Sequence, residues 1–543
     1  MTYQKNYRHW LTSPTLTADE RAYLQGLNDK QIEALFFAPL SFGTAGLRGV
    51  MDIGLHAMNV HIVRHATQAL ADLVLREKEE SPVVVIGYDC RENSKEFAHA
   101  AASVLANNGI AVKLFSELCP TPQVSFAIRH YGAMAGINIT ASHNPREYNG
   151  YKVYWRDGAQ LPTAHAAQMA DVMAGLDVLE NSARHVECQN ADLLTILGQE
   201  TDRLFLDCVL AQRKRATPPD KQLSLLYTPF HGAGYRLVPQ VLREAGYTQV
   251  QLVPEQSIPD GTFPTVKSPN PENIEGFALA IEQAKVEGID VIIGTDPDAD
   301  RVGVIVREGE KYKALSGNQI GVMLADYLIK NTSKETEQMP CVITTIVSTR
   351  MIDVICKAHD VPLFRTFTGF KYIASVMEQH ADTHSLLLGF EESFGYMTGD
   401  FCRDKDAVTA SLLIVEMAHW YAAQDMTLAD GLAALYAQYG NYREETVNLV
   451  MPGVDGLTKM RDLMHNLRRN PPQCIAAAAV KEKIDYNNGI NGLPPSNVLQ
   501  FELADGTTIL VRPSGTEPKV KVYILSSHQE IETYVVWAKQ LAG

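Results

Sequence analysis

The sequence predicts an α/β protein with three α/β domains, whose sheets are mixed or parallel, and a C-terminal α+β domain. At 543 residues the chain is too long for a single hydrophobic core. Strand-like apolar runs are followed by helix-like segments in three successive blocks, an order that is typical of parallel sheets covered by helices. We therefore expect domains over 41–200, 201–310, 311–440 and 441–543, after an N-terminal helical extension over 1–40.

The N-terminal extension and the first block show these signals in order. The run TADE over 17–20 resembles a helix N-cap with an acidic first turn, and apolar residues follow over 23–27. The run PVVVIGYD from Pro82 predicts a buried strand. An alanine-rich helix is expected next, over 94–108, with Gly109 closing it.

The same pattern returns twice before it changes. The run LSLLYTPFHGAGY begins at Leu223 and predicts a strand with a helix after Tyr235. The run CVITTIVSTR begins at Cys341 and predicts a strand with a helix after Thr349. The final block instead has a Gly/Pro/Asn-rich run, the alternating strand FELADGTTILVRPSG and a closing helix from His528. This pattern favours a small α+β domain.

Composition and charge exclude several function classes. The formal net charge of −15 argues against a nonspecific nucleic-acid or anionic-membrane surface, so we expect neither partner. An acidic protein that handles anionic substrates must concentrate its positive charges in one cleft. The eight cysteines lack C-x-x-C spacing and are typical of reduced, mostly buried thiols. The N-terminus has no apolar leader, so we expect a cytoplasmic protein, monomeric or a small homo-oligomer.

One serine stands in a loop suited to meeting a phosphate. The apolar residues over 135–139 predict a short buried strand that ends at Thr140. Ser142 follows in a run of Asn, Pro and Gly, which form turns rather than helices or strands. His143 and Lys152 bring a titratable base and a cation close to it. The alternative is an ordinary polar surface loop.

A second cluster, GTDPDADR, predicts a metal site. Asp296, Asp298 and Asp300 are spaced by two, so their carboxylates can point the same way in an extended loop. Three carboxylates so near to one another repel unless a cation lies among them. Their hard oxygen ligands favour Mg²⁺ or Ca²⁺. An EF-hand is excluded, because Arg301 and Arg307 occupy its glycine and glutamate positions. Three carboxylates leave room for a substrate oxygen, which favours a catalytic Mg²⁺; the alternative is a solvated acidic turn.

Three further loops carry polar residues beside glycine. In GFEESFGYMTGD, Glu391 and Ser393 are suited to gripping vicinal sugar hydroxyls, and Lys405 follows closely. In FGTAGLRG, Arg48 lies in a glycine-rich loop that matches no nucleotide-binding fingerprint. The run RPSGTEPKVKVY offers a guanidinium, two hydroxyls and backbone N–H groups, which suit a phosphate cradle as well as a hairpin turn. Its four candidate residues are Arg512, Ser514, Gly515 and Thr516.

Together and in this order, the five clusters resemble the α-D-phosphohexomutase superfamily over about residues 40–540. The strings T-A-S-H-N-P, D-P-D-A-D-R and R-P-S-G-T-E-P are specific in combination. The G-F-E-E-S-F-G-Y loop resembles that of phosphoglucomutases, and the phosphomannomutase form G-E-x-S-G-H has no counterpart here. The N-terminal extension resembles the branch that contains phosphoglucomutase 2, whose members act on phosphoglucose and phosphopentose. Ala45 stands where many relatives carry serine.

The resemblance implies a role for each candidate residue, in four domains around a central cleft. Ser142 would be the phosphoserine donor, and its phosphate would complete a Mg²⁺ site with the three aspartates. Arg48, His143 and Lys152 would flank the phosphoserine, and Arg301 would lie near the transferring phosphoryl group. The sugar hydroxyls would be bound by Glu391 and Ser393. The non-reacting phosphate would be held by Arg512, Ser514, Gly515 and Thr516, with Lys371 and Lys405 on the substrate side.

The implied reaction interconverts glucose 1-phosphate and glucose 6-phosphate through a bisphosphorylated sugar, with glucose 1,6-bisphosphate as activator. Ribose or deoxyribose phosphates and mannose phosphate are the alternative substrates. Two other classes stay open on the residues alone. A dehalogenase-type phosphohydrolase would use Asp296 as nucleophile, but Asp300 occupies the place of its Thr or Val. A phosphosugar-binding protein would need no nucleophile at Ser142.

Overall fold

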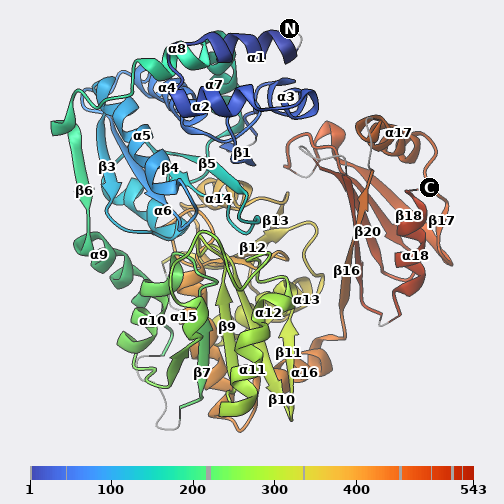
Figure 1. The fold of residues 1–543 in the computed structure, drawn as a ribbon. Coiled ribbons are helices and arrows are strands. Elements are labelled where there is room, and N and C mark those ends of the chain that lie inside the picture. The colour runs from blue at the N-terminus through green and yellow to red at the C-terminus, as the bar shows by residue number, and fades with distance from the viewer. Residues whose placement is uncertain are drawn as a thin grey trace. The chain divides into compact units, whose positions relative to one another are not determined.

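A computed structural model describes residues 3–43, 46–215, 222–333, 337–451, 455–490, 492–514, 519–528 and 530–542 (Figure 1). The chain forms two compact units, each made of two segments. The first unit contains residues 1–317 and 393–425, and the second contains residues 318–392 and 426–543. Within the described residues, no helix is both long enough and apolar enough to cross a bilayer.

The N-terminal extension is helical, as its sequence predicts. Its helices are α1 (Tyr3–Thr12), α2 (Ala18–Gln25) and α3 (Asp29–Phe36). Thr17 caps α2, because its hydroxyl accepts the N–H of Glu20 while the Glu20 carboxylate accepts the N–H of Thr17. The buried rings of Trp10 and Phe36 pack edge to face and join the core of the sheet that follows.

The first sheet has six strands in the order β1-β5-β4-β2-β3-β6. They are β1 (Gly46–Val50), β2 (Val83–Tyr88), β3 (Ala111–Phe115), β4 (Ala135–Ile139), β5 (Tyr148–Trp155) and β6 (Leu194–Leu197). The strands β4, β2, β3 and β6 are parallel, whereas β5 pairs antiparallel with both β4 and β1. The sheet is mixed because the chain turns back directly after β4 without a crossover helix.

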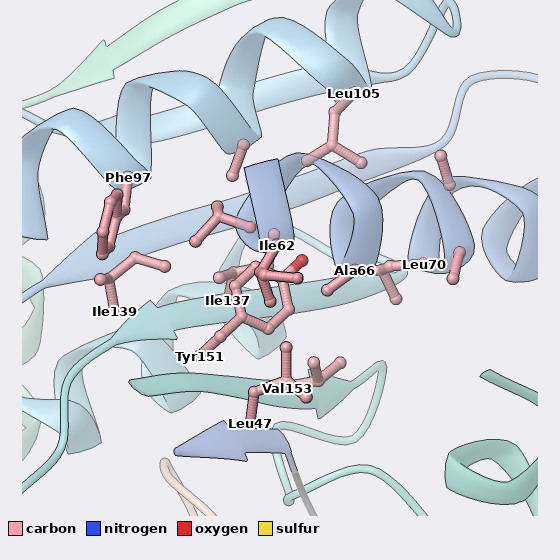
Figure 2. Close-up of a cluster of buried hydrophobic side chains, with 14 of the residues drawn as sticks. Leu47, Ile62, Ala66, Leu70, Phe97, Leu105, Ile137, Ile139, Tyr151 and Val153 are labelled. Atoms are coloured by element: carbon pink, nitrogen blue, oxygen red, sulfur yellow. The ribbon is translucent and has the colours of Figure 1, made fainter. Parts of the chain in front are cut away.

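Helices cover both faces of this sheet. They are α4 (Val60–Arg76), α5 (Ser94–Asn107), α6 (Thr121–His130), α7 (Thr163–Gly175) and α8 (Val178–Ala183), with α9 (Gln199–Leu210) after β6. Side chains of β2 alternate between two cores: Val84 and Ile86 pack with α4 and α5, and Val85 packs with α6. Figure 2 shows the first core, in which Ile62 and Ala66 of α4 lie over Ile137 of β4.

The second sheet, also in the first unit, has the order β11-β10-β9-β7-β8. Its strands are β7 (Leu225–Thr228), β8 (Val250–Leu252), β9 (Val291–Thr295), β10 (Val302–Glu308) and β11 (Lys311–Leu315). The strands β8, β7 and β9 are parallel, and β10 and β11 continue the sheet antiparallel. Its helices are α10 (Gly234–Glu244) and α11 (Ala278–Glu287). The later segment adds β15 (Gly395–Met397) and α15 (Ala407–Ala422) to this unit.

The second unit contains a parallel and an antiparallel sheet. The parallel strands are β12 (Met339–Thr345), β13 (Leu363–Thr366) and β14 (His384–Glu391), with helices α12 (Gly317–Asn331), α13 (Met351–Ala358), α14 (Phe370–Gln379) and α16 (Leu428–Tyr439).

The antiparallel sheet is ordered β16-β21-β20-β19-β18-β17. Its strands are β16 (Arg443–Val450), β17 (Cys474–Ile475), β18 (Ala478–Asp485), β19 (Leu499–Leu503), β20 (Thr508–Pro513) and β21 (Lys519–Ser526). Helices α17 (Gly456–Arg469) and α18 (Glu532–Gln540) accompany it.

Two local predictions need correction against this fold. The closing helix was expected from His528, but α18 begins at Glu532, after the N-cap Ile531. The cysteines are all free, yet only half of them are fully buried. The buried ones are Cys119, Cys341, Cys356 and Cys402, while Cys90, Cys188 and Cys208 are half-buried and Cys474 is exposed.

Candidate active site

Ser142 lies in the loop between β4 and β5 in a conformation that few serines adopt. Its φ is +52°, in the left-handed region, which costs a non-glycine residue about 1–2 kcal/mol. Its N–H donates to Thr140 Oγ1 at 2.8 Å, and its carbonyl accepts from the Arg91 guanidinium. Because both backbone polar groups are held, the backbone of Ser142 and the direction of its Cα–Cβ bond are fixed.

The three aspartates lie in the turn that joins β9 and β10. The extended loop expected from their spacing is wrong: Ala299, with φ +47°, donates its N–H to the Asp296 carbonyl in a tight turn. Asp296 Oδ1 accepts the N–H groups of Asp300 and Arg301, so the chain wraps around this carboxylate. One oxygen of each aspartate lies within 4.8 Å of the others, and all three residues are buried. The turn, not strand alternation, makes the carboxylates converge.

Ser142 meets this cluster directly. Its Oγ–H donates to Asp296 Oδ2 at 2.8 Å, across 154 residues of sequence. Both residues are buried; Asp296 lies directly after β9, and Ser142 lies three residues after the end of β4. The loops of the two sheets therefore place a serine hydroxyl against a carboxylate cluster, which is an arrangement suited to metal-assisted chemistry at that hydroxyl.

Two lysines partly balance the carboxylates. Lys152 Nζ lies 2.6 Å from Asp298 Oδ2 and 3.3 Å from Asp300 Oδ2. Burial would lower the pKa of Lys152, but the two carboxylates outweigh burial and raise it. Lys405 Nζ lies 3.2 Å from Asp300 Oδ2 and 3.0 Å from Asp404 Oδ1. The sequence predicts Lys405 as a substrate contact, whereas the structure places its ammonium at the carboxylate cluster.

The free oxygens of the cluster fit a hard cation. Among the residues that the structure describes, Asp298 Oδ1 and Asp300 Oδ1 are buried without a hydrogen-bond partner. The other oxygen of Asp298 already accepts from Thr121 Oγ1 at 2.7 Å and from Lys152. Burial, with the neighbouring carboxylates, raises the pKa of Asp296 well above its ordinary value. Unpaired carboxylate oxygens this deeply buried are unfavourable unless a cation joins them.

His143 and Arg48 lie beside Ser142. His143 Nδ1 is 3.2 Å from Ser142 Oγ, and Arg48 Nη1 donates to Asn144 Oδ1 at 2.9 Å. Burial and the positive charges of Arg301 and Arg48 hold the pKa of His143 well below its ordinary value. This shift favours the neutral imidazole, which has one N–H donor and one acceptor nitrogen.

Arg301 follows the carboxylate turn and extends the positive side of the site. Its Nη1 donates to Glu272 Oε1 at 2.7 Å, and its backbone pairs with Gly395. Arg48, Lys152, Arg301 and Lys405 all belong to the first unit, so this acidic chain does concentrate cations around one cluster.

In the second unit, Glu391 is the last residue of β14. It is buried, and its Oε1 accepts the N–H of Gly369, which precedes α14. Lys371, in the first turn of α14, places its ammonium 5.0 Å from the Tyr372 ring centroid, and burial lowers its pKa. Ser393 begins the segment that returns to the first unit, so the boundary between the units separates it from Glu391.

The predicted phosphate loop also belongs to the second unit. Arg512 lies on β20 opposite Lys521 of β21 and borders a cavity of about 60 Å³ together with Phe367. Ser514 donates its N–H to the Lys519 carbonyl at 2.8 Å. Gly515 and Thr516 lie outside the described residues, as does Ala45.

Sequence reasoning missed several residues that complete the site. Asp89 and Arg91 follow β2 and contact the Ser142 loop, and Thr121 supports Asp298. Asp404 accepts hydrogen bonds from Tyr154 and Gln160 beside Lys405. A signal for the first pair was present, since charged residues directly after a buried parallel strand gather at the carboxyl edge of the sheet.

The sequence is similar to known proteins over nearly its whole length. Residues 39–178, 185–309 and 316–439 match the phosphoglucomutase/phosphomannomutase alpha/beta/alpha domains I, II and III, and residues 464–535 match the C-terminal domain of that family. A phosphoglucomutase of Staphylococcus haemolyticus is 36% identical over 90% of both chains. One of Staphylococcus aureus is 35% identical over 94% of this chain and 95% of its own. A crystal structure of a putative phosphomannomutase from Thermus thermophilus has a TM-score of 0.71 at 22% identity, covering 93% of this chain and 99% of that one.

Proposed function

Because the chain belongs to the phosphoglucomutase/phosphomannomutase family, we propose that it interconverts glucose 1-phosphate and glucose 6-phosphate. Curated relatives that carry the name phosphoglucomutase support the sugar. The sugar loop G-F-E-E-S-F-G-Y supports it as well, since it resembles the phosphoglucomutase form.

The contact between Ser142 Oγ and Asp296 carries this proposal. A binding protein needs no serine hydroxyl held 2.8 Å from a buried carboxylate cluster. A phosphoryl carrier does, because phosphoryl transfer depends on positioning and on stabilising negative charge. The hydrogen bonds of Asp296 argue against it as a nucleophile, since its Oδ2 accepts from Ser142 Oγ and its Oδ1 accepts from two backbone N–H groups.

The proposed cofactor is Mg²⁺, held by Asp296, Asp298 and Asp300 with a phosphate oxygen on Ser142. When bound, the ion would neutralise charge on the transferring phosphoryl group. Lys152 would favour the ionised form of Asp298, because, despite burial, its ammonium group lowers the pKa of that carboxyl, and Lys405 would place a positive charge beside Asp300. We therefore propose two roles for Lys405: it balances the negative charge of Asp300, and it contacts the substrate.

The proposed cycle has two transfers. In the first, the bond between Ser142 Oγ and phosphorus breaks, a bond from phosphorus to the free sugar hydroxyl oxygen forms, and the hydroxyl proton is passed to Ser142 Oγ, giving a sugar bisphosphate and an unphosphorylated serine. In the second, the bond between the other phosphoryl group and its sugar oxygen breaks, that phosphoryl group bonds to Ser142 Oγ, and the serine proton is passed to the sugar oxygen. His143, whose Nδ1 lies 3.2 Å from Ser142 Oγ, is positioned to exchange the proton with Oγ. Arg48, Lys152 and Arg301 supply positive charge on the phosphoserine side.

The second unit supplies the residues proposed for recognition, except Ser393, which begins the second segment of the first unit. Glu391 would accept hydrogen bonds from sugar hydroxyls, with Ser393 following it in the chain. Lys371 would add a positive contact. The non-reacting phosphate would be bound by Arg512, Ser514, Gly515 and Thr516. Because this site would hold a phosphate rather than one face of the sugar, the bisphosphate could bind in either orientation, as the cycle requires.

The test is a comparison of kcat/KM for the 1-phosphates of glucose, mannose, ribose and deoxyribose, with Mg²⁺ and a trace of glucose 1,6-bisphosphate. A glucose preference of about tenfold or more supports the proposal, since specificity set by a few hydrogen bonds is of this size. A pentose or mannose preference would reassign the substrate but keep the chemistry. No turnover of any sugar phosphate would contradict the enzymatic proposal. We also propose a cytoplasmic enzyme, monomeric or a small homo-oligomer.

A further inference from the structure

One arginine holds most of the loop that carries Ser142. The Arg91 Nη2 donates to the carbonyls of Ser142 and Asn144 at 2.5 and 2.6 Å. Its Nη1 donates to the carbonyls of Pro145 and Tyr148 at 2.9 and 3.0 Å. The four Nη hydrogens are thus used on four backbone carbonyls that span the whole loop from Ser142 to the start of β5. A lysine could not reproduce this pattern, because its three donors radiate from one point.

Asp89 completes the arrangement from the other side of Ser142. Its Oδ2 accepts from Thr140 Oγ1 at 2.6 Å, and Thr140 Oγ1 accepts the Ser142 N–H. The same Oδ2 lies 3.2 Å from Arg91 Nε, and neither side chain of the pair is exposed to solvent. The N–H of Ser142 is therefore tied through Thr140 to Asp89, while its carbonyl is tied to Arg91.

Arg91 is also held by residues of the segment that follows β8 of the second sheet. The Phe263 ring centroid lies 5.0 Å from the Arg91 guanidinium carbon, within the range of a cation–π contact. Gly261 lies so close to the backbone of Cys90 and Arg91 that a Cβ would come within 2.5–2.8 Å of it. The guanidinium therefore has one position, fixed by Asp89 and by the ring of Phe263.

We infer that Asp89 and Arg91 are positioning residues that hold Ser142 in its left-handed conformation and so aim Oγ at the carboxylate cluster. The inference rests on the proposed function for its catalytic consequence, but not for its structural part. A left-handed serine is unfavourable by itself, so the loop needs contacts that enforce this conformation. A displacement of about 1 Å at the reacting atom lowers rates by about a hundredfold. Loss of the contacts that Asp89 and Arg91 make with this loop should therefore lower the rate of phosphoryl transfer.

The test compares Arg91→Lys with the wild type and with Arg156→Lys as a matched control. Arg156 follows β5 on the surface and forms exposed ion pairs with Glu77 and Glu79. The first measurement is hydrogen–deuterium exchange over residues 138–150 in the full chain without substrate. We expect R91K to exchange at least about tenfold faster there than the wild type and R156K, while peptides of β9 and β10 keep their rates.

The second measurement is kinetic. With glucose 1-phosphate, R91K is expected to lose about a hundredfold in kcat while KM stays within about threefold, because Arg91 contacts the loop and not the sugar. R156K should match the wild type in both. A fall in kcat that only tracks the fraction of unfolded protein would be a structural effect and would overturn the inference.

Thr140 gives a second route if R91K fails to fold. Thr140→Val removes the acceptor for the Ser142 N–H with little change of shape, and Thr140→Ser keeps that acceptor. We expect T140V to lose about tenfold in kcat and T140S to recover most of it. Equal kcat values for T140V, T140S and the wild type, or unchanged exchange in R91K, would overturn the inference.

The two proposals fail in distinguishable ways. If the wild type does not turn over any sugar phosphate, the proposed function fails, and the exchange experiment alone decides whether Asp89 and Arg91 hold the loop. If the wild type is active and R91K matches it in exchange and in kcat, the function stands and the positioning role is lost.

Discussion

The carboxylate cluster of the first unit and the phosphate loop of the second unit are built in opposite ways. At the cluster, Asp298 and Asp300 are fully buried, and both form ion pairs with Lys152, whose side chain is 13% exposed. At the phosphate loop, Arg512 and Ser514 are half-buried. The first design fixes its groups before any substrate arrives. The second leaves its groups accessible to a ligand.

This difference separates chemistry from recognition. Removing one member of a buried charge network leaves its partner buried and unpaired, at a cost of about 3–5 kcal/mol. Removing a half-buried arginine takes away a contact to the ligand and leaves the protein largely as it was. Substitutions in the first unit should therefore act on kcat or on metal binding, and those in the second unit should act on KM.

Ser142→Ala should have the largest effect. Without the hydroxyl there is no phosphoryl carrier, so we expect kcat with glucose 1-phosphate to fall by about 10⁴-fold or more. The cause is checked by incubating each protein with ³²P-labelled glucose 1,6-bisphosphate and locating the phosphorylated residue by mass spectrometry. The wild type should carry the label on Ser142, and S142A should carry none there. Ser103→Ala, on α5 and outside the site, is the control and should be normal. Retention of activity in S142A would end the proposed mechanism.

Asp298→Asn should come next, because it removes a cluster carboxylate and the ion pair of 2.6 Å between Lys152 and Asp298. We expect Mg²⁺ affinity to fall about 10–100-fold and kcat to fall with it. Titration calorimetry with MgCl₂ measures the binding without any substrate. Asp192→Asn, at an exposed position, should bind Mg²⁺ like the wild type. Wild-type Mg²⁺ affinity in D298N would place the metal elsewhere.

Arg512→Ala tests the other side of the comparison. Loss of a charge-assisted contact to phosphate should raise KM about 10–100-fold, with kcat changing less than KM. Steady-state kinetics with varied glucose 1-phosphate give both values, and Arg469→Ala, at the exposed end of α17, is the matched control. A loss confined to kcat would mean that Arg512 takes part in the transfer, and the contrast between the two regions would break down.

Glu20→Gln should have the smallest effect on catalysis but a measurable one on stability. The hydrogen bond from His61 outweighs burial and, with the N–H of Thr17, lowers the pKa of Glu20 to about 2. A carboxyl with a depressed folded pKa stabilises the fold above its unfolded pKa, near 4.5, and this stabilisation disappears as pH falls toward 2. Because solvent screens this partly exposed carboxylate, we expect E20Q to lose about 1–2 kcal/mol at pH 7, less than the full pKa shift would give.

The pH dependence makes this prediction specific. The stability difference between E20Q and the wild type should shrink between pH 4.5 and pH 2, the window set by the two pKa values. Denaturant unfolding at several pH values measures it, while kcat at pH 7 should stay within about twofold, because Glu20 lies in the N-terminal extension. A difference that does not change with pH would show that the capping hydrogen bonds, not the charge, matter.

Much of the fold could be predicted because its signals are local. The apolar runs at β2, β4, β7 and β12 follow from composition and spacing alone, and so do the first helices after β2 and β12 and the helix after β7. The antiparallel strands β5 and β10 could not be predicted in the same way, because their pairing depends on a tight turn rather than on their own residues. The Asp296 turn shows the same limit, since its shape is set by backbone hydrogen bonds from Asp300 and Arg301.

The candidate site was predictable where one short motif contains the chemistry. Ser142 and the three aspartates stand out because a nucleophile and spaced carboxylates are unusual after buried strands. Arg91 could not be assigned a role, because its partners are backbone carbonyls, which every residue has. Only the folded loop shows that four of them converge on one guanidinium.

The division of the chain has a consequence for how the protein is made. The first unit is discontinuous: residues 393–425 return to it after the first segment of the second unit. That late segment brings Lys405 to Asp300, and Glu416 of α15 accepts backbone N–H groups of Lys214 and Arg215. On a ribosome, the first 317 residues therefore emerge without a helix and a cation that their own core requires. The unit that would perform the chemistry can finish folding only after about four-fifths of the chain has been synthesised.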